Sequence, residues 1–218
     1  MTFANQLKVN EIFYSLQGES ASTGLATVFV RLSGCPLRCN YCDTSYAFYK
    51  GERFSIAEII NAVADFPAKR VCITGGEPLA QPLVILLMQQ LCDLDYQVSL
   101  ETSGALDISQ VDSRVFVVLD LKTPTSGEVD KNLWSNLAVL RKNSQVKMVV
   151  CNRLDFDWAV GIIRKYSLIE GSEWLLSPMT PGLEPADLAE WLLACRPYLP
   201  ARMQIQLHKV LWNDVAGK

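Results

Sequence analysis

Three cysteines fall within eight positions in the stretch Cys35-Pro36-Leu37-Arg38-Cys39-Asn40-Tyr41-Cys42-Asp43-Thr44, with the spacing C-x3-C-x2-C. Only one turn of loop can aim three side chains so close in sequence at one point. Thiolates are soft donors, so the expected occupant is a soft metal centre, either a zinc ion or an iron–sulfur cube. Each is usually closed by four ligands, so three local cysteines leave one coordination position unassigned. An iron without a protein ligand can bind a small molecule.

The cysteine stretch resembles the signature of radical S-adenosylmethionine enzymes. Two further motifs of that superfamily follow, Gly75-Gly76-Glu77-Pro78 and Glu101-Thr102-Ser103-Gly104, and the aromatic Tyr41 stands before the last cysteine. The resemblance implies a 4Fe–4S cluster on Cys35, Cys39 and Cys42. It also implies that the amino and carboxylate groups of S-adenosylmethionine chelate the fourth iron.

Length and composition fit a cytoplasmic protein with a sizeable core. The chain has 218 residues, which suits one domain or at most two, and half of them are hydrophobic. The net charge is −3, and we find no long basic patch for nucleic acid. The first residues lack the basic and apolar regions of a signal peptide, and no apolar run is long enough to span a bilayer. Seven cysteines without a secretory signal argue against a disulfide framework.

Strand-like and helix-like runs alternate along the chain. Ser55 is expected to cap a helix, with Glu58 completing a capping box. The predicted strands are Val9–Leu16, Ala26–Ser33, Arg70–Thr74, Gln97–Glu101, Val115–Leu121, Gln145–Val150 and Trp174–Leu176, and Met203–Leu207 is expected to be a final strand or a strand-like tail. The other predicted helices are Pro82–Leu94, Asp130–Arg141, Asp155–Tyr166 and Pro185–Cys195.

This alternation predicts a mostly parallel sheet with right-handed crossovers. A complete eightfold barrel takes about 250 residues, so we expect a partial (β/α)6 barrel in a single domain over 1–218. The superfamily resemblance implies the same fold. The cysteine loop and the two downstream motifs each follow a predicted strand, where α/β folds gather their active sites. An incomplete barrel has a lateral opening for a larger substrate, and we expect the segment 1–25 to complete the substrate site.

A finer resemblance, to the 7-carboxy-7-deazaguanine synthase family, covers nearly the whole chain. It is carried by Leu16–Glu19, Val28–Pro36, the Asp43-Thr44 pair and the tail Gln204–Lys209. The resemblance implies a lyase of queuosine biosynthesis that converts 6-carboxy-5,6,7,8-tetrahydropterin to 7-carboxy-7-deazaguanine with loss of ammonia. S-adenosylmethionine would serve as a regenerated cofactor and Mg²⁺ would assist, so no protein residue need act as a nucleophile.

Several residues have expected roles toward substrate and metal. Arg31 lies in an apolar strand, where a lone cation is costly, and its guanidinium can hold a carboxylate through two hydrogen bonds. We expect it to bind the substrate carboxylate, although a structural salt bridge is an alternative. Thr44 offers a hard oxygen to Mg²⁺, although an N-cap threonine would look the same. The remaining expected substrate contacts are Leu16, Gln17, Gly18, Glu19 and Thr102.

The resemblance also implies a binding surface for S-adenosylmethionine. Glycines at a strand end let a backbone edge approach a ligand closely, although tight strand-to-helix turns use them too. The match weakens in the second half of the chain, where residues are carried over by position. The expected contacts are Tyr41, Cys42, Asp43, Gly75, Gly76, Glu77, Gly104, Asp120, Leu121, Lys122, Ser177, Pro178, Met179 and Thr180.

Two other classes of protein remain open on the residues alone. One is a glycyl-radical-enzyme activase, although the sequence lacks the cysteine-rich insert that many activases carry. The other is a zinc-binding or electron-transfer module, whose fourth ligand would come from His208, Cys72, Cys92, Cys151 or Cys195. Cys72, Cys92 and Cys195 fit better as small core residues. For the enzyme we expect a homodimer and an external flavodoxin-like or ferredoxin-like electron donor.

Overall fold

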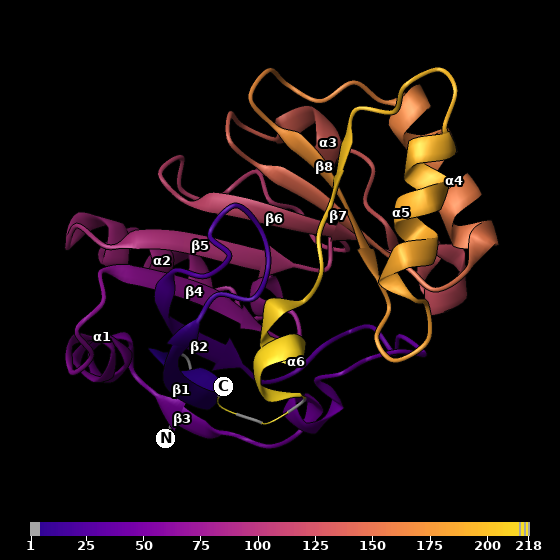
Figure 1. Cartoon of the computed structure of the whole chain (residues 1–218). Coiled ribbons are helices and arrows are strands. Elements are labelled where there is room, and N and C mark those ends of the chain that lie inside the picture. Colours follow the sequence, from indigo (N-terminus) through magenta and orange to yellow (C-terminus); the bar gives the residue numbers. More distant parts are fainter. Residues whose placement is uncertain (1–4, 214, 216, 218) are drawn as a thin grey trace.

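The computed structural model describes residues 5–213, 215 and 217. They form one nine-stranded sheet with the order β3-β1-β2-β4-β5-β6-β7-β8-β9, which curves around an open interior (Figure 1). The strands are β1 (Leu7–Leu16), β2 (Ala26–Leu32), β3 (Glu52–Phe54), β4 (Arg70–Gly75), β5 (Gln97–Thr102), β6 (Phe116–Leu121), β7 (Gln145–Val150), β8 (Glu173–Pro178) and β9 (Ala201–Met203).

The sheet is a partial barrel, as predicted. From β2 through β4 to β9, neighbouring strands pair in parallel, whereas β1 pairs antiparallel with β2 and β3. The strands β3 and β9 form the two edges, so the sheet does not close on itself. The prediction of a final strand over Met203–Leu207 is wrong in position, because β9 ends at Met203 and a short helix begins at Leu207.

Helices cover the outer face of the sheet. They are α1 (Ile56–Ala64), α2 (Val84–Asp93), α4 (Arg153–Lys165) and α5 (Pro185–Ala194), whereas α6 (Leu207–Trp212) lies on the inner side (Figure 1). The predicted capping box of α1 is confirmed: the Ser55 side chain accepts from the backbone N–H of Glu58, whose carboxylate accepts from the backbone N–H of Ser55. The helix α2 begins at Val84, after Pro82 rather than on it.

The predicted helix over Asp130–Arg141 is wrong. The segment holds a 3-10 turn at Val129–Lys131 and the four-residue helix α3 (Asn136–Val139). The amide of Asn132 bonds both backbone groups of Lys122, and the Asn136 amide donates to the carbonyl oxygen of Gly104 at 3.1 Å. These asparagines tie the segment to neighbouring loops, and this tertiary bonding replaces a continuous helix.

Alternation along the strands separates two environments. In β6, Leu119 and Leu121 belong to the hydrophobic core under the helices, whereas Val118 and Asp120 line the interior cavity. The same period of two places Lys147 of β7 inside. The outward face therefore forms an apolar core with the helices, and the inward face is free to carry charged side chains.

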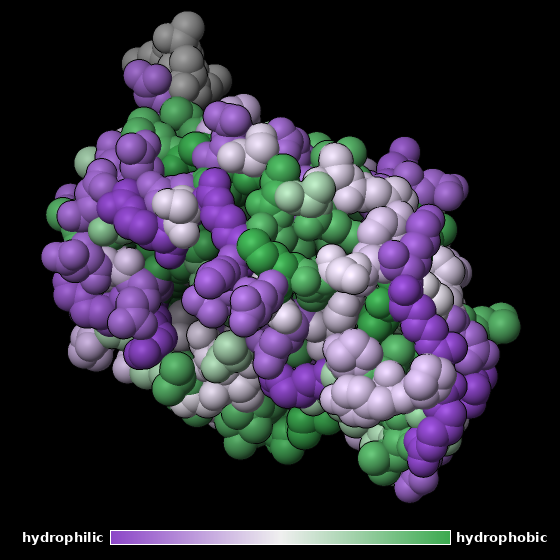
Figure 2. All heavy atoms as spheres, turned by 90° about the horizontal axis from the view of Figure 1, so that it is seen from above, coloured by the Kyte–Doolittle hydropathy of each residue, from purple (hydrophilic) through white to green (hydrophobic). Residues whose placement is uncertain are grey.

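The outer surface mixes both kinds of residue. Figure 2 shows hydrophilic residues interspersed with several smaller hydrophobic areas on the face seen from above. Such scattered exposure is ordinary for a folded domain.

Candidate active site

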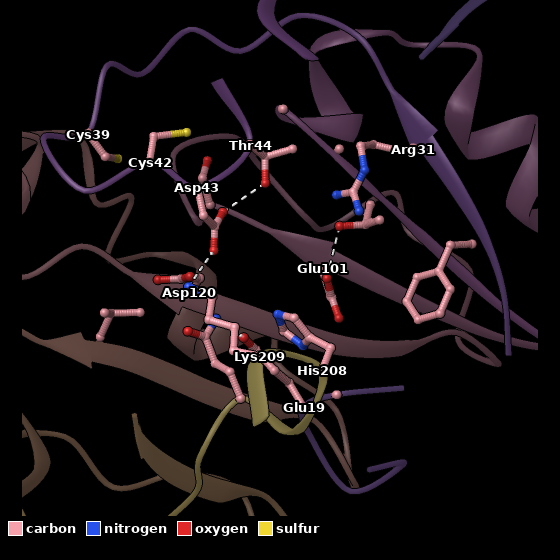
Figure 3. Close-up of a pocket in the computed structure, with 18 of the residues that line it drawn as sticks. Glu19, Arg31, Cys39, Cys42, Asp43, Thr44, Glu101, Asp120, His208 and Lys209 are labelled. Atoms are coloured by element: carbon pink, nitrogen blue, oxygen red, sulfur yellow. Dashed lines mark hydrogen bonds and ion pairs between the residues drawn. The ribbon is translucent and has the colours of Figure 1, made fainter. Parts of the chain in front are cut away.

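A cavity of about 260 Å³ lies inside the barrel, at the carboxyl ends of the parallel strands. The cysteine loop forms one wall, and the inward faces of the strands form another (Figure 3). The residues Leu16 to Glu19 also contribute, as do the tail residues Gln206, His208, Lys209, Asn213, Val215 and Gly217. Residues far apart in sequence therefore meet at one site, on the side of the sheet where α/β enzymes work.

The cysteine loop is held in place by backbone bonds. Asn40 donates its backbone N–H to Ser126 O at 3.0 Å, and its side-chain amide donates to Thr125 O at 3.0 Å. The predicted cluster ligands, Cys35, Cys39 and Cys42, are half-buried free thiols that all line the cavity.

The donor set fits an iron–sulfur cube. Burial raises the pKa of all three thiols, that of Cys39 to about 11, because the half-buried site solvates a thiolate poorly. A bound metal would stabilise the thiolate forms in place of water. Within the described residues, no group of three or more His, Cys, Asp or Glu side chains is arranged around a single metal ion. In a cube each cysteine binds a different iron.

Two glycines bring the end of β4 against the cysteine loop. A Cβ on Gly76 would lie 2.1 Å from Gly34 O and 2.9 Å from Cys35 Cβ. Gly75 has φ +138°, and a Cβ there would lie 2.2 Å from Leu32 O. No side chain fits at either position, so the backbone edge of this motif lies directly beside Cys35, the first cysteine of the loop.

Glu77 joins the ends of two strands. Its carboxylate is fully buried and accepts from Leu79 N at 2.9 Å, Thr102 Oγ1 at 2.9 Å, Ser103 N at 2.7 Å and Ser103 Oγ at 2.5 Å. These bonds fix the turn after β4 to the turn after β5. The carboxylate thus faces its own hydrogen-bond partners rather than the cavity.

Asp43 stands between Thr44 and the C-terminal helix (Figure 3). Thr44 Oγ1 donates to Asp43 Oδ1 at 2.8 Å, and Lys209 Nζ lies 3.3 Å from Asp43 Oδ2. Burial by itself would raise the pKa of Asp43, but the Lys209 charge and the Thr44 hydrogen bond outweigh it and lower the pKa. Asp43 is therefore a paired carboxylate next to Cys42, the last cysteine of the loop.

Arg31 has a structural partner and also lines the cavity. Its Nε donates to Glu11 Oε1 at 2.7 Å, and the Tyr46 hydroxyl donates to the same oxygen at 2.9 Å. The alternative of a salt bridge is thus realised through Nε. The two Nη groups have no hydrogen-bond partner among the described residues, so the guanidinium keeps its outer edge for a ligand.

A buried charge network forms the floor of the site. Lys147 Nζ lies 2.6 Å from Glu19 Oε2 and 3.2 Å from Asp120 Oδ2, and Lys122 Nζ lies 3.2 Å from Asp120 Oδ1. Gln206 Nε2 donates to the other Glu19 oxygen at 2.6 Å. Two ammonium groups therefore balance two carboxylates in a space where an unpaired charge would be costly.

The N-terminal segment is closed by the C-terminal tail. A Cβ on Gly18 would lie 2.0 Å from His208 Nδ1, and Leu207 N donates to Gly18 O at 2.9 Å. Gln17 Nε2 donates to Glu101 Oε1 at 3.1 Å. Leu16, Gln17, Gly18 and Glu19 therefore form a wall of the cavity together with Gln206 and His208 of the tail.

Most of the residues expected to contact substrate or cofactor line the cavity, but five do not. Glu77 uses its carboxylate as described above, and Gly104 forms the turn that receives Leu133 N and Asn136 Nδ2. Leu121 faces the core because Asp120 and Lys122 face the interior. Ser177 and Pro178 lie buried in β8, and the chain reaches the cavity only at the next residues.

Sequence reasoning missed several charged and polar residues of the cavity. Glu101 and Lys147 are isolated charges in apolar strands, the same signal that identified Arg31, so the period-two pattern was sufficient to find them. His208 and Lys209 belong to the tail that carries part of the family resemblance, but the only site role that the sequence suggests for either is that of an alternative zinc ligand for His208. Their position depends on how the tail folds back, which no local pattern predicts.

The four other cysteines are buried or half-buried free thiols. Cys72 and Cys92 are buried in the core, as expected, and Cys195 packs against it. Cys151 is a half-buried free thiol whose pKa burial raises to about 12. None of these four lines the cavity within the part of the chain that the structure describes.

Comparisons with known proteins agree with this geometry. Residues 29–121 match the model of the Radical SAM superfamily. The 7-carboxy-7-deazaguanine synthase of Chlorobaculum tepidum is 42% identical over 213 residues, covering 96% of both chains. That of Thermoplasma acidophilum is 32% identical, covering 96% of this chain and 99% of the relative.

Solved structures confirm the fold. The crystal structure of QueE from Escherichia coli superposes with a TM-score of 0.72 at 24% identity, covering 93% of this chain and 95% of that one. Streptococcus suis SuiB bound to its precursor peptide gives a TM-score of 0.57 at 14% identity, covering 82% of this chain and 48% of the other. No helix among the described residues combines the length and apolar character that crossing a membrane requires.

The relatives support the synthase rather than the activase or the metal-binding module. Their similarity extends over both the cysteine loop and the second half of the chain, where the motifs are weaker. With the cysteine triad, the glycine edge and the charged floor gathered in one partial barrel, the chain belongs to the 7-carboxy-7-deazaguanine synthase family of radical S-adenosylmethionine enzymes.

Proposed function

We propose that this chain is a carbon–nitrogen lyase that converts 6-carboxy-5,6,7,8-tetrahydropterin to 7-carboxy-7-deazaguanine and ammonia, in queuosine biosynthesis. The relatives are named for this activity, and this chain aligns with nearly the whole length of each. The observation that supports it most directly is the convergence of Cys35, Arg31 and Glu19 on one cavity. A metal centre, a cation for a carboxylate and an acceptor for ring N–H groups are what such a substrate requires.

The cysteine loop and the glycine edge hold the cofactors. Cys35, Cys39 and Cys42 bind the 4Fe–4S cluster, and the backbone at Gly76 binds the amino group of S-adenosylmethionine. When bound, the cluster and S-adenosylmethionine together supply the one-electron chemistry that starts the rearrangement. The protein aligns the ligands and excludes water. Other contacts proposed for S-adenosylmethionine are Tyr41, Asp43, Gly75, Glu77, Gly104, Asp120, Leu121, Lys122, Ser177, Pro178, Met179 and Thr180, of which the residues outside the cavity act through the backbone or through their neighbours.

The substrate lies between Arg31 and Glu19 in this proposal. The free edge of the Arg31 guanidinium binds the substrate carboxylate by charge-assisted hydrogen bonds. Glu19 is held by Lys147 and Gln206, so its carboxylate is fixed in place while it accepts ring N–H groups. The backbone of Leu16–Gly18 and the side chain of Thr102 complete the contacts.

Thr44 is the proposed protein ligand of Mg²⁺. The ion prefers oxygen ligands, keeps several waters and often binds through substrate oxygens. The donor set fits, because the Thr44 hydroxyl gives its hydrogen to Asp43 and keeps its lone pairs for a cation. We further propose a homodimer in the cytoplasm that receives electrons from a flavodoxin-like or ferredoxin-like protein.

Anaerobic turnover tests the proposed function. The reconstituted protein is mixed with S-adenosylmethionine, dithionite and the carboxylated tetrahydropterin, and the deazaguanine product is measured by mass spectrometry. We expect product with substoichiometric S-adenosylmethionine. A protein with an intact cluster that cleaves the cofactor but forms no deazaguanine contradicts the proposal.

A further inference from the structure

The C-terminal helix places a cation beside the proposed magnesium ligand. Lys209 comes from α6, and its side chain is only 9% exposed. Its Nζ lies 3.3 Å from Asp43 Oδ2 and donates to Thr180 O at 3.2 Å. Figure 3 shows Asp43 between this ammonium group and Thr44. A lysine thus reaches across the cavity from the tail to the cysteine loop.

This contact pairs a cation with the carboxylate that precedes Thr44 in the chain. Asp43 gives one oxygen to the Thr44 hydroxyl and the other to Lys209. The threonine therefore presents lone pairs but no negative charge, because its neighbour's charge is already balanced. A divalent cation gains little from a single neutral oxygen, since Mg²⁺ sheds its water shell reluctantly.

We propose that Lys209 is a built-in counter-ion that makes divalent-cation binding at Thr44 depend on the substrate. In the free enzyme the Lys209 ammonium group is paired with the Asp43 carboxylate, so the Thr44 site binds Mg²⁺ weakly. The substrate carboxylate brings the missing negative charge and completes the oxygen set. This inference rests on the proposed function, because it takes Thr44 as the metal ligand.

The consequence is an order of binding. Mg²⁺ enters with or after the substrate, because the substrate carboxylate supplies the negative charge that the Thr44 site lacks. Lys209 is a positioning residue in this account, since it acts through Asp43 and does not touch the metal.

Binding of Mn²⁺ to the cluster-loaded protein tests the proposal without turnover. Free Mn²⁺ is measured by electron paramagnetic resonance during an anaerobic titration, with no substrate present. The variant Lys209→Met should bind Mn²⁺ about tenfold or more tightly than the unaltered protein, because removing one neighbouring charge near a partly buried site is worth that much. Adding the tetrahydropterin should tighten binding in the unaltered protein and change the variant less.

Matched variants separate charge from packing. Lys209→Arg keeps the charge and should behave like the unaltered protein. Lys209→Gln also removes the charge and should show the same gain in Mn²⁺ affinity as Lys209→Met. It therefore serves as a second neutral variant if Lys209→Met folds poorly. Lys142→Met removes a charge from an exposed loop and should leave the titration unchanged. The double variant Lys209→Met with Asp43→Asn should lose the added affinity.

The outcomes are distinguishable from failure of the proposed function. Equal Mn²⁺ affinity in the unaltered protein and in both neutral variants overturns the role of Lys209, whatever product the enzyme makes. Added affinity that survives Asp43→Asn also overturns it, because the cation would then bind elsewhere. Absence of the deazaguanine product from the unaltered enzyme refutes the function instead.

Discussion

Replacing Glu77 by glutamine tests whether the carboxylate clamp holds the two active-site turns together. Each carboxylate oxygen accepts a backbone N–H, from Leu79 at 2.9 Å on one side and from Ser103 at 2.7 Å on the other. A glutamine amide has one oxygen and one NH₂, so either orientation points a donor at a backbone donor. The substitution keeps the shape and removes the bonding.

The expected cost follows from the bonds that are lost. A hydrogen bond to a charged group contributes about 1.5–3 kcal/mol, and a buried N–H left without a partner costs about 1–3 kcal/mol. Relief of the buried charge offsets part of this, so we expect Glu77→Gln to lower the free energy of unfolding by roughly 3 kcal/mol. For a chain of this size that lowers the melting temperature by roughly 6–12 °C.

Thermal unfolding of the cluster-free, reduced protein, followed by circular dichroism, measures the effect. Glu190→Gln makes the same chemical change on the exposed face of α5 and should shift the midpoint by no more than about 2 °C. We also expect Glu77→Gln to bind S-adenosylmethionine more weakly, because both turns move. A Glu77→Gln protein that melts with the control shows that the clamp does not stabilise the site.

Three further predictions concern the substrate, the metal and the cluster. Arg31→Ala should lower kcat/KM about 10–100-fold with normal iron content, since one or two charge-assisted hydrogen bonds to the substrate are lost. Glu11→Gln should keep most of the activity, because the guanidinium remains. Equal losses in the two variants would show that Arg31 acts only through its ion pair with Glu11. Thr44→Ala should abolish the response of the rate to Mg²⁺, with Thr44→Ser retaining it, and an unaltered magnesium titration would remove this hydroxyl from the metal shell. Gly76→Ala should incorporate little iron, because its Cβ would lie 2.1 Å from a backbone oxygen of the cysteine loop, whereas Gly161→Ala meets nothing within 4 Å; normal iron in the former contradicts the steric argument.

The site was predictable where the sequence pattern is local. The spacing of Cys35, Cys39 and Cys42 requires a single loop, and alternation in β2 marked Arg31 as an inward cation. The same alternation in β6 explains why Leu121 belongs to the core while Asp120 belongs to the cavity. The sequence-based expectation carried this segment over whole, so it did not separate the residue that faces the core from its neighbours that face the cavity.

Longer-range bonding decided the elements that local patterns missed. The segment after β6 has helical spacing, yet Asn132 and Asn136 bond to loops that precede them by 10 to 32 residues. A chain cannot show such partners in a short window. The same holds for Glu77, which belongs to a predicted cofactor motif but whose carboxylate accepts hydrogen bonds from the turn after the next strand.

The sequence by itself determined the sheet, the cysteine loop and the family, because strand periodicity, thiol spacing and glycine placement are properties of short segments. The tertiary structure alone decided that Lys147 pairs with Glu19 and that Lys209 reaches Asp43. Both contacts join parts of the chain more than a hundred residues apart. Their partners are chosen by how the barrel curves and how the tail folds back, since buried charges must find each other wherever the fold brings them.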